Sequence, residues 1–588
     1  MKKIIVFAFL LSTLLACKQA PKSANTNLAT LFDEYYDQYL RYNPIEATTQ
    51  GDKRFNDQLP NDGTAAFRDS LQNFYQTYLT KLEAFDRNEL VENDQISYDI
   101  FKYDLERKLE GLKQPSWMIP FNQFWALPLT MGQLGSGEGV QPFKTVKDYD
   151  DWLKRVKGFS VWADTAMANF RKGMTAGVVL PQSLVVKMIP QMESMVVSDA
   201  TKSLFYGPVK QFPKDISTAE QTRITQAYQE AITKELVPTY KKLGDFLKNE
   251  YLPKARTSSG ISAIPGGKDM YAFYVKSWTT TDKTPEEIYQ IGLSEVKRIR
   301  GEMERIKNEV GFKGDLNAFF NYMRSDARFM PYKTPQEVIA AFNKIHETMI
   351  PNLKKLYGRT PKTPFEVRQT EAFRAASASA EYVQGSPDGS RPGIFYVPIL
   401  DARQFNTTSG MESLFLHEAI PGHHYQISLQ QENESLPKFR RFSWYGAYGE
   451  GYALYCESLG KELGLYTDPY QYMGALGDEI HRAIRLVVDV AIHTKNMSRE
   501  EAIKYMMDNE AINEQGATAE IERYMAIPGQ ALSYKIGALK IRELRAKYEK
   551  ALGAKFNIAK FHDELLKDGC MPLAVLEKKM DVWAESQK

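Results

Sequence analysis

The sequence predicts a mainly α-helical fold on two observations. Helix-start signals with amphipathic periodicity recur along the 588 residues, and strand signals are few. A chain of this length buries a large core, and 43% hydrophobic and 25% charged residues are ordinary for a globular protein. The Gly/Pro-rich stretch at 258–269 predicts a boundary between an N-terminal helical half at 28–265 and a second half at 266–588, together forming one continuous unit.

The N-terminal segment MKKIIVFAFLLSTLLAC predicts a secretory leader over residues 1–16. It has two lysines, an apolar run too short to span a bilayer, and a small residue before Cys17. The ending LLAC resembles a bacterial lipobox, which implies cleavage before Cys17 and lipidation of its thiol. Residues 17–27 would then be a polar tether that holds an exported body at the membrane, on its periplasmic or cell-surface face.

Charge and cysteine content argue against a nucleic-acid partner and against a structural zinc. Lys+Arg of 75 against Asp+Glu of 73 gives +2, and two lysines lie in the leader, so the mature chain is near neutral and has no basic field for nucleic acid. With Cys17 lipidated, only Cys456 and Cys570 would remain free. They permit one disulfide without implying it, and no CxxC pattern suggests a structural zinc.

Three segments carry the same helix-start signal. In TPEEIYQIGLSEVKRIRGEMERI, Thr284 is the expected N-cap, Pro285 the first helical residue and Glu287 the capping-box partner. TPQEVIAAF at 334 and SREEAIKYMM at 498 repeat the signal. The apolar residues of the first segment fall on roughly one helix face: Ile288, Ile291, Val296, Ile299, Met303 and Ile306.

The best strand signal is RPGIFYVPIL at 391–400. Its β-favouring run at 394–397 lies between Pro392 and Pro398, which predicts an edge strand because proline cannot donate a ladder hydrogen bond. An edge strand could pair with an extended peptide, so Phe395 and Tyr396 are candidate substrate-binding residues.

The stretch LFLHEAIPGHHYQ at 414–426 holds three of the seven histidines. A helix is expected to enter it from SGMESLFL, with Ser409 as N-cap and Glu412 in the capping-box position. Zinc hydrolases of the HExxH type place two histidines four residues apart on one helix face. Here the fourth position after His417 is Pro421, so that pattern fails.

A deformed turn could still bring two histidines together. In an unbroken helix His424 lies about 10 Å along the axis from His417, too far for two bonds of about 2 Å to one metal. Pro421 removes a backbone donor and Gly422 frees the neighbouring dihedrals, so a widened turn could return a later histidine toward His417. His423 needs the smaller expansion and is favoured, with His424 as the alternative.

The third ligand is expected from YGEGYALYCESLGKELG. Glu450 and Glu457 are seven residues apart on one face of a predicted helix. A carboxylate commonly joins two histidines at zinc, so Glu450 is the predicted ligand. Glu457 is predicted to orient a histidine from behind.

The motifs HEAIPGHH, EGYALYCE and PGQALSYKIGALKIRELR (528–545) resemble the bacterial DUF885 family, and similar local features cover nearly all of the mature chain. That family is grouped with gluzincin-like, HExxH-related zinc metallopeptidases. The resemblance implies a large helical body with a central cleft and a small β-sheet next to the metal-binding helix. EGYALY is similar to the stretch that provides the third ligand in zinc aminopeptidases.

These expectations combine into an exported, lipid-anchored zinc peptidase acting on short peptides. Zn²⁺ on His417, His423 and Glu450 would lower the pKa of a bound water, with Glu418 as general base and Tyr534 as donor to the oxyanion. The alternative is a non-catalytic helical lipoprotein that captures peptides or nutrients for uptake. The remaining candidate substrate anchors are Arg482, Arg485, His493 and Arg523.

Overall fold

The computed structural model describes residues 24–370, 379–386, 389, 391–408 and 410–588. The described residues are mainly helical, with one small sheet, which confirms the predicted fold class. The leader at 1–16 and Cys17 lie outside them. Helix α1 begins at Thr26, so the predicted tether is two residues too long. No helix among the described residues is both long and apolar enough to span a bilayer.

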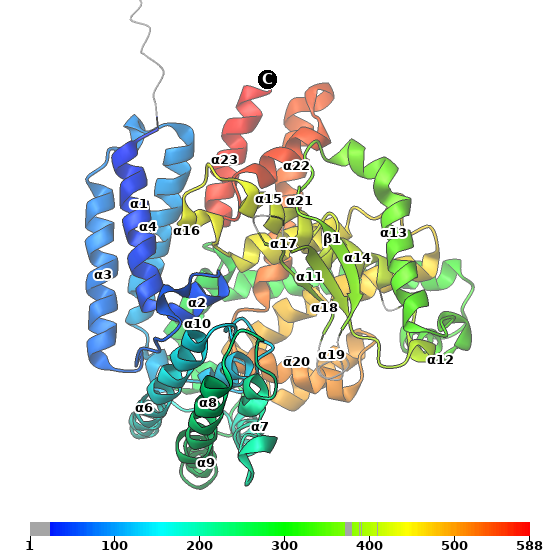
Figure 1. The fold of residues 1–588 in the computed structure, drawn as a ribbon. Helices are drawn as coiled ribbons and strands as arrows, with labels where there is room; N and C mark the ends of the chain where they lie inside the picture. The colour runs from blue at the N-terminus through cyan, green and yellow to red at the C-terminus, as the bar shows by residue number, and fades with distance from the viewer. Residues whose placement is uncertain (1–23, 371–378, 387–388, 390, 409) are drawn as a thin grey trace, which may run out of the picture.

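The N-terminal helices form two groups (Figure 1). Helices α1, α3 and α4 stand together at one side of the molecule, and α6 to α9 lie below them. The bounds are α1 Thr26–Tyr42, α2 Pro44–Thr49, α3 Ala65–Glu83, α4 Glu92–Leu112, α5 Leu127–Gly135, α6 Val146–Ala176, α7 Gln182–Glu193, α8 Thr218–Ala231 and α9 Val237–Phe246.

The rest of the chain surrounds the sheet. Helices α17 and α21 pack against each other, as do α11 and α18. The bounds are α10 Gly267–Thr279, α11 Pro285–Glu309, α12 Leu316–Ser325, α13 Pro335–Leu356, α14 Met411–Glu418, α15 His423–Glu432, α16 Lys438–Arg441, α17 Gly446–Glu457, α18 Pro469–Thr494, α19 Arg499–Asn509, α20 Glu514–Ala526, α21 Leu532–Leu552, α22 Ile558–Lys567 and α23 Leu573–Ser586.

The three predicted helix starts are confirmed. Thr284 and Ser498 form complete capping boxes at the starts of α11 and α19, and the Thr334 side chain accepts from the Glu337 N–H at the start of α13. Five of the six apolar residues predicted for one face of α11 are buried, and Ile291 is half-buried. Local capping chemistry therefore fixed these boundaries.

Two hydrophobic cores interleave along the chain. One joins α1, α3 and α4 to α14, α15, α17 and α21 to α23. The other joins α6 to α9 to α11, α12 and α18 to α20. Both cores take residues from each side of the predicted boundary near 265, so packing ties the two halves together. Cys456 and Cys570 are both free and buried.

The sheet has the order β1-β3-β2, with β1 at Phe365–Gln369, β2 at Glu381–Val383 and β3 at Gly393–Val397. β3 pairs in parallel with β1 and antiparallel with β2, so it is the central strand. The predicted strand exists, but the predicted edge position is wrong. Pro392 and Pro398 flank the strand instead of lying within it, so neither removes a ladder donor. A peptide cannot add to β3, because both of its sides are paired.

The sheet packs against the helices of the histidine motif. The Phe395 ring lies 6.3 Å from the ring of Phe415 in α14, and the Phe365 ring lies 5.0 Å from that of His424 in α15. The sheet thus forms one wall behind these two helices.

Candidate metal centre

The histidine motif is two helices with a break between them. Helix α14 ends at Glu418 and α15 begins at His423. The helix is therefore interrupted, whereas the sequence predicted one helix with a widened turn. The intervening peptide Ile420–Pro421 is cis. A Cβ on Gly422 would lie 2.0 Å from the carbonyl oxygen of His417, so only glycine permits this close return of the chain.

The predicted capping box of α14 is wrong. Gly410 precedes the helix with φ of +81° and provides no side-chain cap, and Ser409 lies outside the described residues. The Glu412 carboxylate instead accepts the backbone N–H of Tyr466 at 2.7 Å. Glu412 therefore anchors the loop that contains Tyr466.

The break brings His417 and His423 together with Glu450. Both Nε2 atoms lie 3.4 Å from the same oxygen, Oε2 of Glu450, and the three atoms lie within 4.8 Å of one another. A charge-assisted N–H···O bond is about 2.8 Å long, whereas ligand atoms about 2.0–2.2 Å from a tetrahedral ion are roughly 3.4 Å apart. The donor set and its spacing therefore fit a divalent metal such as zinc.

Close packing of α17 against α21 positions Glu450. A Cβ on Gly451 would lie 2.6 Å from Gly537 of α21, so the two backbones touch at this point. Glu450 is in the second turn of α17, one residue before this contact. Its position is fixed by backbone packing, not by its own side-chain contacts.

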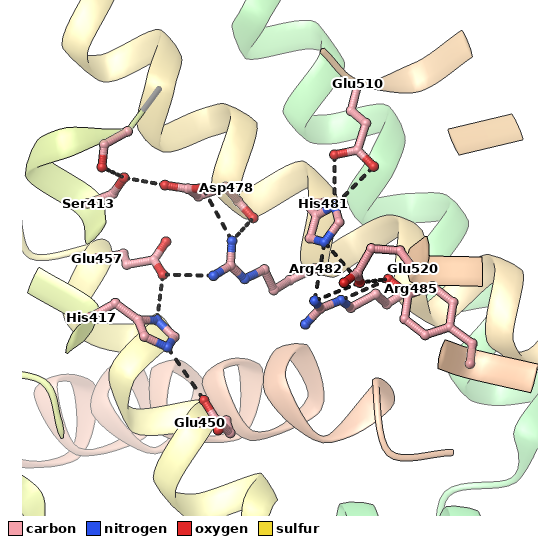
Figure 2. A network of polar contacts seen from close by, with 12 residues as sticks. Ser413, His417, Glu450, Glu457, Asp478, His481, Arg482, Arg485, Glu510 and Glu520 are labelled. Carbon is pink, nitrogen blue, oxygen red and sulfur yellow. Dashed lines mark hydrogen bonds and ion pairs between the residues drawn. The ribbon is translucent and has the colours of Figure 1, made fainter. Parts of the chain in front are cut away.

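A chain of polar contacts holds His417 from behind. Its Nδ1 donates to Oε1 of Glu457 at 2.7 Å, and the Arg482 guanidinium lies 3.9 Å from that same oxygen (Figure 2). Arg482 also pairs with Asp478 at 3.3 Å, and Asp478 accepts from the Ser413 hydroxyl. This arrangement leaves Nε2 as the free nitrogen of His417, as a ligand requires.

Both histidines of the cluster are buried and Glu450 is half-buried. Burial by itself lowers the pKa of His417, but Glu450 and Glu457 raise it to about 10. Burial raises the pKa of Glu450, and His417 with His423 more than offset this, leaving the pKa well below its usual range. No lysine or arginine of the described residues pairs with Glu450. The surroundings of His417 are thus negative enough to favour a cation.

His424 lies outside the cluster. Its Nδ1 is 2.9 Å from the Tyr382 hydroxyl and 3.4 Å from that of Ser428, toward the sheet. Burial lowers the pKa of His424 to about 4, so the ring is neutral. Of the two histidines left open by the sequence, the structure places His423 beside His417.

Glu418 is held by a strand that the sequence did not predict. Its Oε2 accepts the backbone N–H of Tyr382 in β2 at 2.9 Å, and the side chain is half-buried. Strand β2 has only three residues and no alternating pattern, so its sequence carries no usable strand signal. Tyr382 therefore joins the site through its backbone and, at His424, through its hydroxyl.

The other predicted residues divide into surface and core. Tyr534 is half-buried at the start of α21, with the Arg485 guanidinium 4.7 Å from its ring. Arg523 and Tyr396 are half-buried. Phe395 and His493 are both 0% exposed.

The core placement of His493 corrects its assignment as a substrate anchor. Nδ1 accepts the N–H of Ile261 at 3.0 Å, and Nε2 donates to the carbonyl of Tyr524 at 3.0 Å. Both ring nitrogens are engaged, so neither can reach a ligand. Phe395 likewise packs its ring against Phe342 and contributes no surface.

The fold and the site define a mainly helical protein whose buried His–His–Glu cluster could hold a metal ion. The chain belongs to the DUF885 family, whose description is "Bacterial protein of unknown function" and which matches residues 44–580.

Two solved structures are similar to the chain. A candidate lipoprotein of Colwellia psychrerythraea shares 27% identity and a TM-score of 0.85, with 95% of this chain and 99% of that one covered. A candidate lipoprotein of unknown function from Shewanella oneidensis shares the fold at 20% identity and a TM-score of 0.74, with 95% and 100% covered. A carboxypeptidase of Pyrococcus furiosus aligns at 9% identity and a TM-score of 0.42, too low to support an argument. No curated protein matches the chain.

Proposed function

We propose that the protein is a zinc-dependent peptidase that hydrolyses peptide bonds in short peptides. The observation that carries the proposal is the convergence of His417, His423 and Glu450 at a spacing suited to one tetrahedral ion, with Glu418 adjacent in sequence to a ligand. The three would hold zinc through two imidazole nitrogens and one carboxylate oxygen. Zinc in such a site supplies a Lewis acid and an acidified water.

The protein's own groups would handle orientation and the proton. Glu457 keeps the His417 proton on Nδ1. Glu418 is the proposed base, which takes a proton from water and returns it to the leaving amine. The Tyr382 N–H fixes its carboxylate, so the base does not need to reorganise during the reaction. Tyr534 is the proposed donor to the developing oxyanion, and Arg482 positions Glu457 instead of anchoring substrate.

We also propose that the protein is exported and lipid-anchored through Cys17. The lipobox-like LLAC supports this, and both similar structures come from candidate lipoproteins. Metabolic labelling with radioactive palmitate tests it. Label is expected in the wild type and absent from Cys17→Ser, whereas label in both would contradict lipidation at this residue.

The function is tested with purified protein starting at residue 18. The protein is incubated with a mixed peptide library, with and without chelator, and products are identified by mass spectrometry. Glu418→Gln is expected to keep stoichiometric zinc and lose about 10²- to 10⁴-fold in rate. Glu434→Gln, with an exposed carboxylate, is the matched control and should behave as wild type.

Two results would contradict the proposal. Unchanged cleavage in Glu418→Gln would remove the assigned base. Zinc and peptide bound without any cleavage by the wild type would instead support the non-catalytic binding lipoprotein.

A further inference from the structure

Two tryptophans of the described chain carry large exposed surfaces. Trp125 is 54% exposed and Trp444 is 45% exposed, although tryptophan is a residue that folding usually removes from water. A third, Trp278, is half-buried, and its ring lies 5.7 Å from that of Trp125. We call Trp444, Trp278 and Trp125 the tryptophan row.

The row begins at the metal cluster. The Trp444 ring lies 5.8 Å from the His423 ring. It also covers Gly449, where a Cβ would lie 2.2 Å from the Trp444 ring. Gly449 directly precedes Glu450. Trp444 therefore stands beside two of the three candidate ligands.

The row continues along the first turn of α17. A Cβ on Gly446 would lie 3.8 Å from the Trp278 ring. Residues three apart share one helix face, and Gly446, next to Trp278, is about 4.5 Å along the axis from Gly449, which Trp444 covers. The two rings line the same face of the helix that bears Glu450.

The row ends in an apolar pocket. Trp278 and Trp125 have ring centroids 5.7 Å apart, and both line a pocket of about 270 Å³. This is smaller than the roughly 300–1,000 Å³ of sites for drug-sized molecules, so it suits one or two side chains. The other walls of the pocket include the large aliphatic residues Leu180, Ile264, Met270 and Ile527.

The pocket is formed before any ligand arrives. The Asn122 Oδ1 accepts the N–H groups of Phe124 and Trp125 at 2.8 and 2.9 Å, and its Nδ2 donates to the Ala526 carbonyl at 3.1 Å. Ala526, the last residue of α20, also lines the pocket. The Trp125 loop is therefore tied to a second segment of the wall, and a preformed site loses less entropy on binding.

We propose that the tryptophan row and its pocket form a subsite of the metal centre for an aromatic or large aliphatic side chain of an extended peptide. The proposal rests on the proposed peptidase function and names its substrate class. Gly446 and Glu450 are four positions apart in α17, about 6 Å along the helix axis. Laid end to end with the 5.7 Å between the last two rings, this gives a path of about 12 Å, the reach of three to four extended residues at about 3.3 Å each.

The wall chemistry favours a peptide side chain over a sugar. Stacked tryptophans also suit sugar rings, but the aliphatic walls would leave sugar hydroxyls without partners. Two polar side chains that line the pocket are already engaged, since Arg256 donates to the carbonyls of Val179 and Gly260 and Asn122 donates to that of Ala526. An apolar side chain makes no such demand.

The test measures binding separately from cleavage. Hexaalanine and the six hexapeptides with one alanine replaced by phenylalanine are titrated into Glu418→Gln by calorimetry, with and without zinc. Phenylalanine at one position is expected to tighten binding at least about tenfold over hexaalanine. The advantage should fall below about twofold when Trp125→Ala or Trp278→Ala is added. Phe124→Ala is the matched control, an exposed aromatic of the same loop that does not line this pocket, and should keep the advantage.

Several outcomes overturn the subsite. These are no binding by any of the seven peptides, no position at which phenylalanine tightens binding, or an advantage that survives both tryptophan changes. Tighter binding of chitotetraose than of every peptide would assign the row to a glycan instead. Trp278→Phe, which keeps a ring, guards against misfolding and should retain most of the advantage. Failure of the peptidase proposal would appear separately, as absence of cleavage by the wild type.

Discussion

Two histidine–carboxylate clusters lie close together in the molecule, and only one has a protein cation in it. In the first, two imidazoles of His417 and His423 meet one oxygen of Glu450. In the second, His481 bonds Glu510 through Nδ1 and Glu520 through Nε2, and the Arg485 guanidinium lies 3.0 Å from Glu520 (Figure 2). Arg485 supplies the positive charge there.

The difference teaches how to separate a metal site from a structural network. In the second cluster, the two nitrogens of His481 contact two different carboxylates, Glu510 and Glu520. The Arg485 guanidinium pairs with Glu520. The first cluster directs one nitrogen from each histidine at a shared point, and its arginine, Arg482, pairs with Glu457 and Asp478 instead of Glu450. A shared point without a protein cation is the mark of a site for an added ion.

The largest expected effect comes from a substitution that disrupts the first cluster alone. His417→Ala should weaken zinc binding at least about a thousandfold, because one of three protein ligands is lost. His481→Ala should leave zinc affinity within about twofold of wild type. Competition titration with a chromogenic chelator measures both. Equal losses in the two variants would show that the clusters are not distinct in this way.

The next effect breaks the second cluster. Arg485→Met removes a buried guanidinium from the half-buried carboxylate of Glu520, which keeps Arg523 at 3.5 Å, and should cost about 1.5 to 3 kcal/mol in the free energy of unfolding. Urea denaturation of metal-free protein measures it. Arg305→Met removes exposed ion pairs and should cost below about 1 kcal/mol. Zinc affinity should be unchanged in both folded variants, and a loss in Arg485→Met would join the clusters into one unit.

A smaller effect sharpens the role of the group behind His417. Glu457→Gln keeps the side-chain size and removes the charge that orients the ring, so zinc binding should weaken about 10- to 100-fold. Glu462→Gln, on the surface and paired with Arg545, is the control and should bind zinc normally. An unchanged affinity in Glu457→Gln would show that packing alone orients His417.

The smallest effect concerns Asp478, which lies between the two clusters. Burial, with a contribution from nearby Glu457, raises the pKa of Asp478 from 3.8 to about 6 although Arg482 opposes the shift. The folded state therefore binds the proton more tightly than the unfolded state does. The contribution of Asp478 to the free energy of unfolding should be highest below about pH 4 and fall as pH rises to about 6, by about 1 to 2 kcal/mol. Asp478→Asn should remove this decrease, as urea titrations at pH 4, 5 and 6 would show. An identical slope in the variant would assign the decrease to other groups.

The sequence predicted features that depend on local chemistry. Thr284 with Pro285 and Glu287, and Ser498 with its capping box, fixed helix starts because a cap requires only neighbours in the chain. The placement of Glu457 beside His417 also agrees with its predicted orienting role. The position of Glu457 near the histidines could be predicted because Glu450 and Glu457 share a helix face.

The features that the sequence could not predict depend on distant partners. β3 became central only because β1 and β2 pair with it, and neither has a strong strand pattern. The same limit applies to the break at 419–422, where the close approach of Gly422 to His417 is a tertiary contact. His493 looked available because its burial by Ile261 and Tyr524 involves segments far from it in sequence.

The contact between Gly451 and Gly537 has a consequence for the history of the sequence. A methyl group at 451 would meet the Gly537 backbone at 2.6 Å, and one at 537 would meet the carbonyl of Ala447 at 1.7 Å. A side chain at either position would clash with backbone atoms. A substitution at the other glycine could not relieve that clash. The two positions are thus under one joint evolutionary constraint, and relatives that keep the carboxylate corresponding to Glu450 should retain both glycines as an inseparable pair.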